Sequence, residues 1–141
     1  KKMPLKHWVC FYLARALGNL SDSASVDSLI AALKQPQEAA SGFPDPLGPG
    51  VLFLHNDLTP CWRAGAAWAL GEIGDKKAGP ILLKVTGDLL NAIDTRYASV
   101  RALEKIADPK LLPAIKKLAA DYPEVSTRRA MLRICNPRDG F

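Results

Sequence analysis

This sequence has no long hydrophobic run, few histidines and no closely spaced pair of cysteines, and each shortage excludes a class of protein. No stretch of the 141-residue chain approaches the roughly 18 uninterrupted apolar residues that a membrane-spanning helix needs, so we expect no membrane partner. With 48% apolar and 23% charged residues, the chain still has the composition of an ordinary globular domain. We therefore predict a single domain over residues 1–141.

The scarcity of histidine and the spacing of the cysteines argue against metal and nucleophile chemistry. His7 and His55 lie far apart in the sequence, and neither precedes a glutamate. Cys10, Cys61 and Cys135 include no C-x-x-C pair, which favours buried thiols in a reducing compartment such as the cytoplasm over disulfides or zinc ligands. A pairing of His55 with Cys61 would have no third residue to orient it. We expect no catalytic residue, no metal and no other cofactor.

Charge and glycine content give little support to a nucleotide or nucleic-acid partner. The net charge of +5 permits attraction to acidic proteins or to phosphates, but many globular domains carry as much. No glycine-rich stretch is followed by Lys-Ser or Lys-Thr, which excludes the common phosphate-binding loop. We therefore favour a protein over a nucleic acid as the partner.

In place of these features the sequence has an internal repeat. The pattern of Ala66, Ala69, Leu70, Ile73 and Asp75 recurs 33 residues later, again 28 residues after that, and also 53 residues earlier. The other copies are Leu13, Ala16, Leu17, Leu20 and Asp22; Ser99, Ala102, Leu103, Ile106 and Asp108; and Thr127, Ala130, Met131, Ile134 and Asn136. A fixed period indicates stacked supersecondary units, with Leu70, Leu103 and Met131 in equivalent places of consecutive layers.

Each copy predicts a helical hairpin. The i, i+3, i+4, i+7 spacing places its apolar residues on one stripe of a first helix, helix A, and a second set with the same spacing predicts helix B. Asp22, Asp75 and Asp108 stand between the helices, where a carboxylate can accept hydrogen bonds from the free N–H groups that begin helix B. Pro109, directly after Asp108, suits the first helical position. We predict that these aspartates are N-caps and not catalytic acids.

These hairpins resemble HEAT repeats, in particular the short HEAT-like type first associated with phycobilisome lyases. The resemblance is carried by the segment Cys61-Trp-Arg-Ala-Gly-Ala-Ala-Trp-Ala-Leu-Gly-Glu-Ile-Gly-Asp75 and by Arg101-Ala-Leu-Glu-Lys-Ile-Ala-Asp-Pro109. It covers about residues 7–34 and 59–136. It implies an all-α fold, a right-handed α-solenoid of about three and a half stacked hairpins, with the A helices on its convex side and the B helices on its concave side.

Some positions match the family pattern and others depart from it. Arg63 and Arg96 match the family's arginine near the start of helix A. The first copy has Cys10 at that place, and the fourth has Glu124 or a neighbour. In the third copy, Glu104 replaces a glycine.

The period is broken between the first two copies, where residues 35–57 form a Pro/Gly-rich insertion. Loops of that length inside compact domains usually serve a function or are disordered. The glycines and prolines prevent a regular helix, and the segment then turns apolar at residues 51–54. We regard this insertion as the best candidate for a binding site.

Trp68 stands at a repeat position that other copies fill with arginine and that the helical stripe directs toward solvent. Two interpretations are open. Residues 51–54 fold back over Trp68 as a satellite core, or Trp68 forms an exposed docking patch together with Phe53 and Trp62.

The B helices predict a modest basic ridge on the concave side. Leu83 and Lys84 belong to the second copy, and Lys116 and Lys117 belong to the third, next to Lys110. The lysines suit solubility, an acidic protein surface or a phosphate backbone. No aromatic residue is interleaved with them, which counts against single-stranded nucleic acid.

The two ends of the repeat array lack polar capping units. Residues 8–13 are apolar nearly all round their helix, which predicts burial on both sides, and the fourth copy has no helix B after Pro137. Two explanations are open. The chain is a segment of a longer repeat protein, or its ends pair in an end-to-end or homo-oligomeric contact.

These observations predict a non-catalytic scaffold that binds another protein through its concave face and its long inter-repeat loop. The candidate partner-binding residues are Phe53, His55, Trp62, Trp68, Leu83, Lys84, Lys110, Lys116 and Lys117. Two alternatives stay open: a HEAT-like lyase or chaperone subunit that binds a tetrapyrrole chromophore, which only the resemblance implies, and a HEAT-like nucleic-acid-binding module.

Overall fold

The chain folds into α-helices joined by short 3₁₀ turns. The computed structural model describes residues 5–35 and 62–138, and these residues contain seven α-helices and no strand. The helices are α1 (Leu5–Asn19), α2 (Val26–Lys34), α4 (Trp62–Ile73), α5 (Gly79–Gly87), α6 (Ile93–Ile106), α7 (Leu112–Ala120) and α8 (Val125–Cys135). The 3₁₀ turns η1 (Ser23–Ser25), η2 (Lys76–Ala78) and η3 (Pro109–Leu111) lead directly into α2, α5 and α7.

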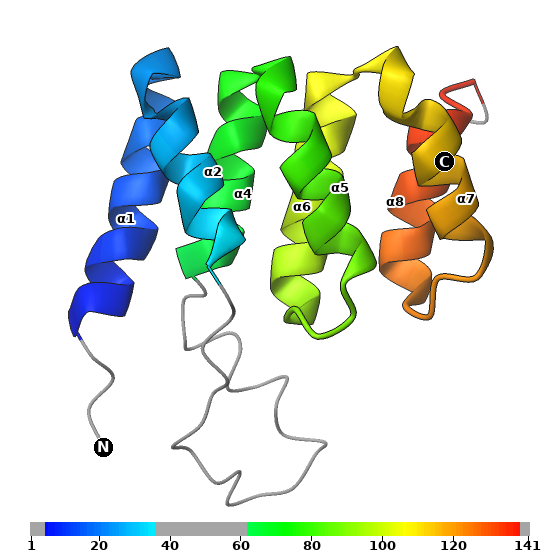
Figure 1. Ribbon diagram of the computed structural model, residues 1–141, viewed down its shortest axis with the longest axis horizontal. Coiled ribbons are helices and arrows are strands. Elements are labelled where there is room, and N and C mark those ends of the chain that lie inside the picture. Colours follow the sequence, from blue (N-terminus) through cyan, green and yellow to red (C-terminus); the bar gives the residue numbers. More distant parts are fainter. Residues whose placement is uncertain (1–4, 36–61, 139–141) are drawn as a thin grey trace, which may run out of the picture.

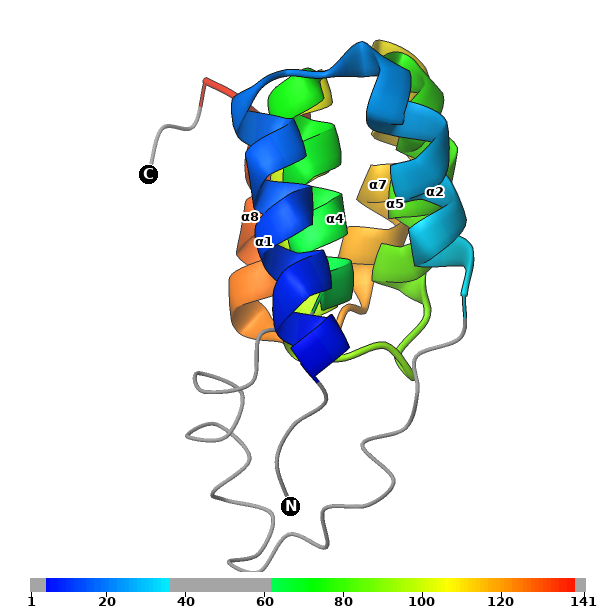
Figure 2. The same ribbon diagram turned by 90° about the vertical axis from the view of Figure 1, so that its left-hand side faces the viewer.

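The helices form two layers. Helices α1, α4, α6 and α8, which we call the A layer, lie side by side in chain order (Figure 1), and α2, α5 and α7 form the B layer beside them (Figure 2). Each A helix packs on the next one, and each B helix packs on the A helix of the following hairpin, as α2 does on α4 and α5 does on α6. This arrangement is an all-α solenoid of stacked helical hairpins, which confirms the predicted fold class.

A capped 3₁₀ turn precedes each B helix. The side chains of Asp22, Asp75 and Asp108 accept a hydrogen bond from the backbone N–H two residues later, at 2.9–3.1 Å. The predicted N-cap role is therefore confirmed, although each aspartate caps the 3₁₀ turn and not the α-helix behind it. Because each carboxylate satisfies a backbone donor that the turn leaves free, the chain reverses in the same way in every hairpin.

The apolar stripes of the inner copies form the core. Leu70, Leu103 and Met131 are buried in α4, α6 and α8, as predicted. In the first copy, Leu17 packs against this core, but Leu13 is 57% and Leu20 is 77% exposed. Among the described residues α1 has a neighbouring A helix on one side only. Of the residues 8–13 for which burial on both sides is expected, Tyr12 and Leu13 are exposed, and the side chains of residues 8–11 lie outside the described ones.

In two pairs of successive A helices, a glycine of one helix lies against the backbone of an alanine of the next. A Cβ atom at Gly18 would lie 2.8 Å from the Cα atom of Ala69, and one at Gly71 would lie 2.7 Å from the Cα atom of Ala102. Both distances are too short for any real side chain, so glycine sets the spacing between these helices. In the third copy Glu104 stands at the glycine position, and its carboxylate forms ion pairs with arginines of α6 and α8.

Candidate protein-binding face

Two hollows separate the B helices, and together they bring several of the predicted binding residues to one surface. The first hollow, of about 450 Å³, lies between α5 and α7. Leu83, Lys117 and Leu118 line it from the helices, and Leu89 and Pro123 line it from the turns that follow them. Its volume falls within the range of about 300–1,000 Å³ that is usual for binding clefts.

The second hollow, of about 330 Å³, lies between α2 and α5 and is more polar. Lys34, Lys84 and Asp88 contribute charged groups to it, and Leu90 contributes an apolar one. Gln35, the first residue of the predicted insertion, also lines this hollow. We call the solvent side of the B layer, together with these two hollows and the turn at residues 88–91, the B face.

The most exposed apolar residues of the B face are two that the sequence analysis missed. Leu89 and Leu90 lie in the turn between α5 and α6, and they are 54% and 90% exposed. Leu89 lines the first hollow and Leu90 lines the second. The sequence does contain a signal for their exposure, because these two consecutive leucines lie between two helical stripes and belong to the core pattern of neither helix.

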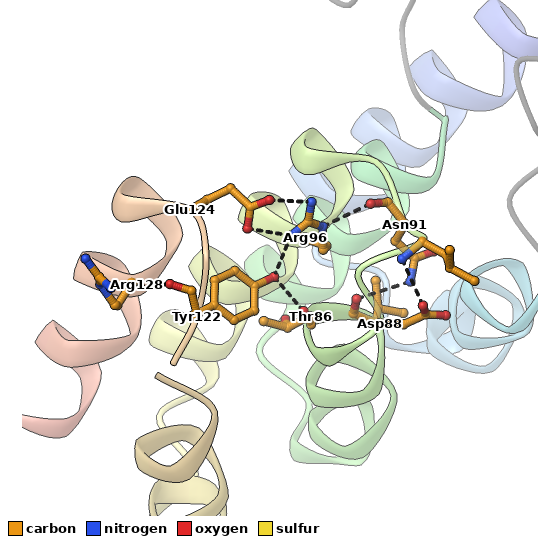
Figure 3. Close-up of polar contacts among 9 residues, drawn as sticks. Thr86, Asp88, Asn91, Arg96, Tyr122, Glu124 and Arg128 are labelled. Carbon is orange, nitrogen blue, oxygen red and sulfur yellow. Dashed lines mark hydrogen bonds and ion pairs between the residues drawn. The ribbon is translucent and has the colours of Figure 1, made fainter. Parts of the chain in front are cut away.

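Polar contacts, some of them buried, hold the turn that carries these leucines (Figure 3). The side chain of Asn91 is buried, donates from Nδ2 to the carbonyl oxygen of Val85 at 3.2 Å, and accepts a hydrogen bond from Arg63. The Asp88 side chain accepts a hydrogen bond from the backbone N–H of Leu90 at 3.0 Å. The leucines are therefore displayed on an ordered turn.

The arginines that match the family pattern connect neighbouring hairpins. Arg63, at the start of α4, donates to the carbonyl oxygen of Leu33 at the end of α2, at 2.8 Å, and reaches forward to Asn91. Arg96, at the equivalent place in α6, donates from Nε to the carbonyl oxygen of Asn91 at 2.9 Å. Both side chains are buried, so this position of the repeat is structural.

Arg96 also ties α6 to the turn that precedes α8. Its guanidinium donates to both carboxylate oxygens of Glu124, at 2.6 and 2.7 Å, and to the hydroxyl oxygen of Tyr122 at 3.1 Å. The Tyr122 hydroxyl in turn donates to the carbonyl oxygen of Thr86 at 2.6 Å (Figure 3). In the fourth copy Glu124 stands at the repeat position that Arg96 fills in the third copy. Its carboxylate accepts the hydrogen bonds that Arg96 donates.

These contacts change the acidity of two side chains. The hydrogen bonds from Arg96, aided by its positive charge, hold the pKa of the Glu124 carboxyl below its ordinary value of 4.5. Burial raises the pKa of the Tyr122 hydroxyl above 10.0, although Arg96 opposes this shift. At neutral pH Glu124 is therefore a carboxylate that accepts, and Tyr122 is a neutral phenol that can donate.

The predicted basic residues of the B face occupy different places. Lys84 lines the second hollow and Lys117 lines the first. Lys116 is exposed beside Cys135 of α8, where its charge acts against the rise in the pKa of the thiol that burial causes. Lys110 lies on the turn η3, away from both hollows. The predicted ridge is therefore divided, with one lysine in each hollow and two outside them.

Trp68 is partly buried at the junction of α1 and α4. The guanidinium of Arg15 lies over its ring, with 5.3 Å between the guanidinium carbon and the ring centroid. A Cβ atom at Gly18 would come within 2.8 Å of the ring, so the missing side chain of α1 leaves room for the indole. The ring is therefore less open to solvent than its repeat position predicts, and its role in binding stays a prediction.

The remaining candidates lie outside the described residues or lack described side chains. Phe53, His55 and the whole insertion after Gln35 fall in the first group, and Trp62, which begins α4, falls in the second. In the described ranges, no three His, Cys, Asp or Glu side chains gather as they would around a metal ion. No helix of the described part is long and apolar enough to cross a membrane.

The stacked hairpins, the capped turns and the repeat-related arginines define a helical solenoid protein. A family model described as HEAT repeats matches residues 51–134, which is more than half of the chain, and a model of the PBS lyase HEAT-like repeat matches residues 9–35. The chain belongs to the HEAT-repeat family, in which repeats generally mediate protein interactions. No curated protein matches the chain.

Proposed function

We propose that this chain is a non-catalytic scaffold that binds another protein through its B face and the inserted 35–57 segment. The observation that carries the proposal is the pair of leucines, Leu89 and Leu90, exposed on an ordered turn between two hollows. Exposed apolar groups beside a cleft are typical of protein interfaces, and an ordered display lowers the entropy lost on binding. The insertion supports the same surface, because Gln35 lines the second hollow.

The proposal can be tested by photo-crosslinking in the organism's own cells. A photoreactive phenylalanine derivative replaces Leu90 in the full chain, and the matched control carries it at Leu132, which is exposed on α8 of the A layer. We expect a defined protein adduct from position 90 and not from position 132. Deletion of residues 36–57 should weaken the adduct if the insertion contributes. Identical adduct patterns at both positions would contradict a binding role for the B face.

A second candidate function is the binding of a tetrapyrrole, as a lyase or chaperone subunit. Its support is the match of residues 9–35 to the PBS lyase HEAT-like repeat. Mixing the purified protein with a free bilin should then change the visible absorbance of the bilin. An unchanged spectrum would remove this candidate and leave the scaffold proposal in place.

A further inference from the structure

The strongest unassigned feature of the B face is the combination of an apolar hollow with lysines that form no ion pair with another described residue. The hollow between α5 and α7 is lined mainly by aliphatic side chains, including Leu83, Leu89 and Leu118. Such walls favour the burial of one or more apolar side chains of a partner. Leu89 stands at its rim and extends the apolar surface toward Leu90.

The charges around this surface have one predominant sign. Lys34 and Lys84 line the second hollow and Lys117 lines the first, and none of the three forms an ion pair with another described residue. The acidic side chains of the two hollows are Asp121 in the first and Asp88 in the second, so three lysines face two carboxylates. An incoming segment therefore meets more unpaired positive than negative charge, and acidic side chains would be the complement.

The A layer is different, because several of its cations are already paired. Lys105 forms an ion pair with Glu72, and Arg101 forms one with Glu104 at 2.5 Å. These contacts join charges within the solenoid and leave less for a partner. On the B side the pair of Lys77 with Asp27 lies outside both hollows. The lysines of the hollows form no ion pair with another described residue, which suits these hollows to an acidic segment.

We infer that the B face binds a short protein segment that combines apolar anchor residues with flanking Asp or Glu. The anchors enter the α5–α7 hollow against Leu89, and the carboxylates pair with Lys117 and, across the turn, with Lys84. This inference rests on the proposed scaffold function and adds the chemistry of the partner. The walls of the hollow are mainly aliphatic, and Tyr122, the aromatic residue in its lining, is only 2% exposed. The hollow therefore offers no open aromatic ring on which a nucleic-acid base could stack, which favours a peptide over an oligonucleotide.

A random peptide library tests the inference without knowledge of the partner. Phage that display peptides of about 12 residues, long enough for several helical turns or a strand, are selected on the full chain. Selected peptides are then synthesised with a fluorescent label, and their affinities are measured by fluorescence anisotropy. We expect the selected sequences to be enriched in leucine-like residues next to Asp or Glu.

Matched variants locate the site. Leu89→Asp should weaken binding about tenfold or more, whereas Leu132→Asp on the A layer should not. Lys117→Glu and Lys84→Glu should each weaken it about threefold, whereas Lys110→Glu, outside both hollows, should have no effect. Circular dichroism of each variant checks that its helices are intact.

Several results would overturn the inference. Selection of basic or purely polar peptides would exclude an acidic, apolar partner, and equal losses in the Leu89 and Leu132 variants would exclude this site. Tighter binding of a labelled single-stranded oligonucleotide, or of phosphatidylcholine–phosphatidylserine vesicles, would point to another class of partner. If position 90 crosslinks to a protein in cells while no acidic peptide is selected, the scaffold function stands and the partner chemistry proposed here is wrong.

Discussion

Arg96 is the side chain on which the polar contacts between the last hairpins converge. It is 4% exposed, and it donates to Asn91, Tyr122 and Glu124. Arg96→Met would leave all three acceptors without this donor, and we expect it to lower the free energy of unfolding by about 3 kcal/mol. Arg96→Lys keeps the charge but loses the fork that reaches both carboxylate oxygens, so its cost should be intermediate. Urea unfolding followed by circular dichroism measures both.

Arg101 provides the matched control for Arg96, because it lies in the same helix and also pairs with a glutamate. Its side chain is 43% exposed, and its partner Glu104 is on the same helix. Exposed pairs of this kind contribute little, so Arg101→Met should lower the free energy of unfolding by no more than about 0.5 kcal/mol. Equal losses at positions 96 and 101 would show that the contacts of Arg96 with the next hairpin carry no special weight.

The ion pair between Arg96 and Glu124 predicts a pH dependence of stability. Because the pKa of Glu124 is lower in the folded protein than its ordinary value of 4.5, its contribution is fully present above that value and is lost as the pH falls through the folded pKa. Glu124→Gln removes this contribution. The difference in unfolding free energy between wild type and Glu124→Gln should therefore be largest near neutral pH and should shrink below pH 4.5. A difference that stays constant down to acidic pH would contradict the assignment.

The spacing of helices in the A layer depends on glycine. A methyl group at Gly71 would meet the Cα atom of Ala102 at 2.7 Å, and backbone cannot move aside as a flexible side chain can. Gly71→Ala should therefore push α6 away from α4 and lower the free energy of unfolding by about 2 kcal/mol, despite the better helix propensity of alanine. Thermal and urea unfolding measure the change.

Gly87 is the control for this prediction, because it also lies in the last turn of a helix but has room for a methyl group. A Cβ atom there would lie 3.7 Å from Leu118, an ordinary contact distance. Gly87→Ala should be neutral or should stabilise the protein by up to about 1 kcal/mol, since it reduces the conformational freedom of the unfolded chain. A destabilisation equal to that of Gly71→Ala would mean that helix ends, and not helix contacts, govern both substitutions.

The hairpins were predictable from sequence because their signals are local. Helical periodicity, the aspartate before each B helix and the period itself depend on residues close together in the chain, and Asp75 and Asp108 cap their turns as predicted. The surroundings of Trp68 were not predictable in the same way. They depend on Gly18, a residue of another helix whose missing side chain matters only after α1 and α4 are packed.

The candidate site was predicted only in part, because it is made of spaces between hairpins. The sequence placed Leu83, Lys84 and Lys117 on the B helices, and these residues line the hollows. It did not separate Lys116 and Lys110 from them, because helix periodicity gives the direction of a side chain and not the identity of its neighbours. Leu89 and Leu90 were missed because analysis of stripes does not assign residues in turns.

In a stack of repeats, residues at the same repeat position can contribute differently to the free energy of unfolding, depending on which copy they belong to. Leu20 of the first copy and Ile106 of the third are equivalent in sequence, but Leu20 is 77% exposed while Ile106 is 6% exposed. A solenoid is stabilised by contacts between neighbouring units, so a side chain contributes only where a neighbour covers it. Ile106→Ala should lower the free energy of unfolding by about 3 kcal/mol, whereas Leu20→Ala should lower it by less than about 0.5 kcal/mol. Urea unfolding of the full chain measures both values under the same conditions. A cost at Leu20 as large as that at Ile106 would contradict the exposure of Leu20 in the turn after α1, since only a covered leucine can contribute so much.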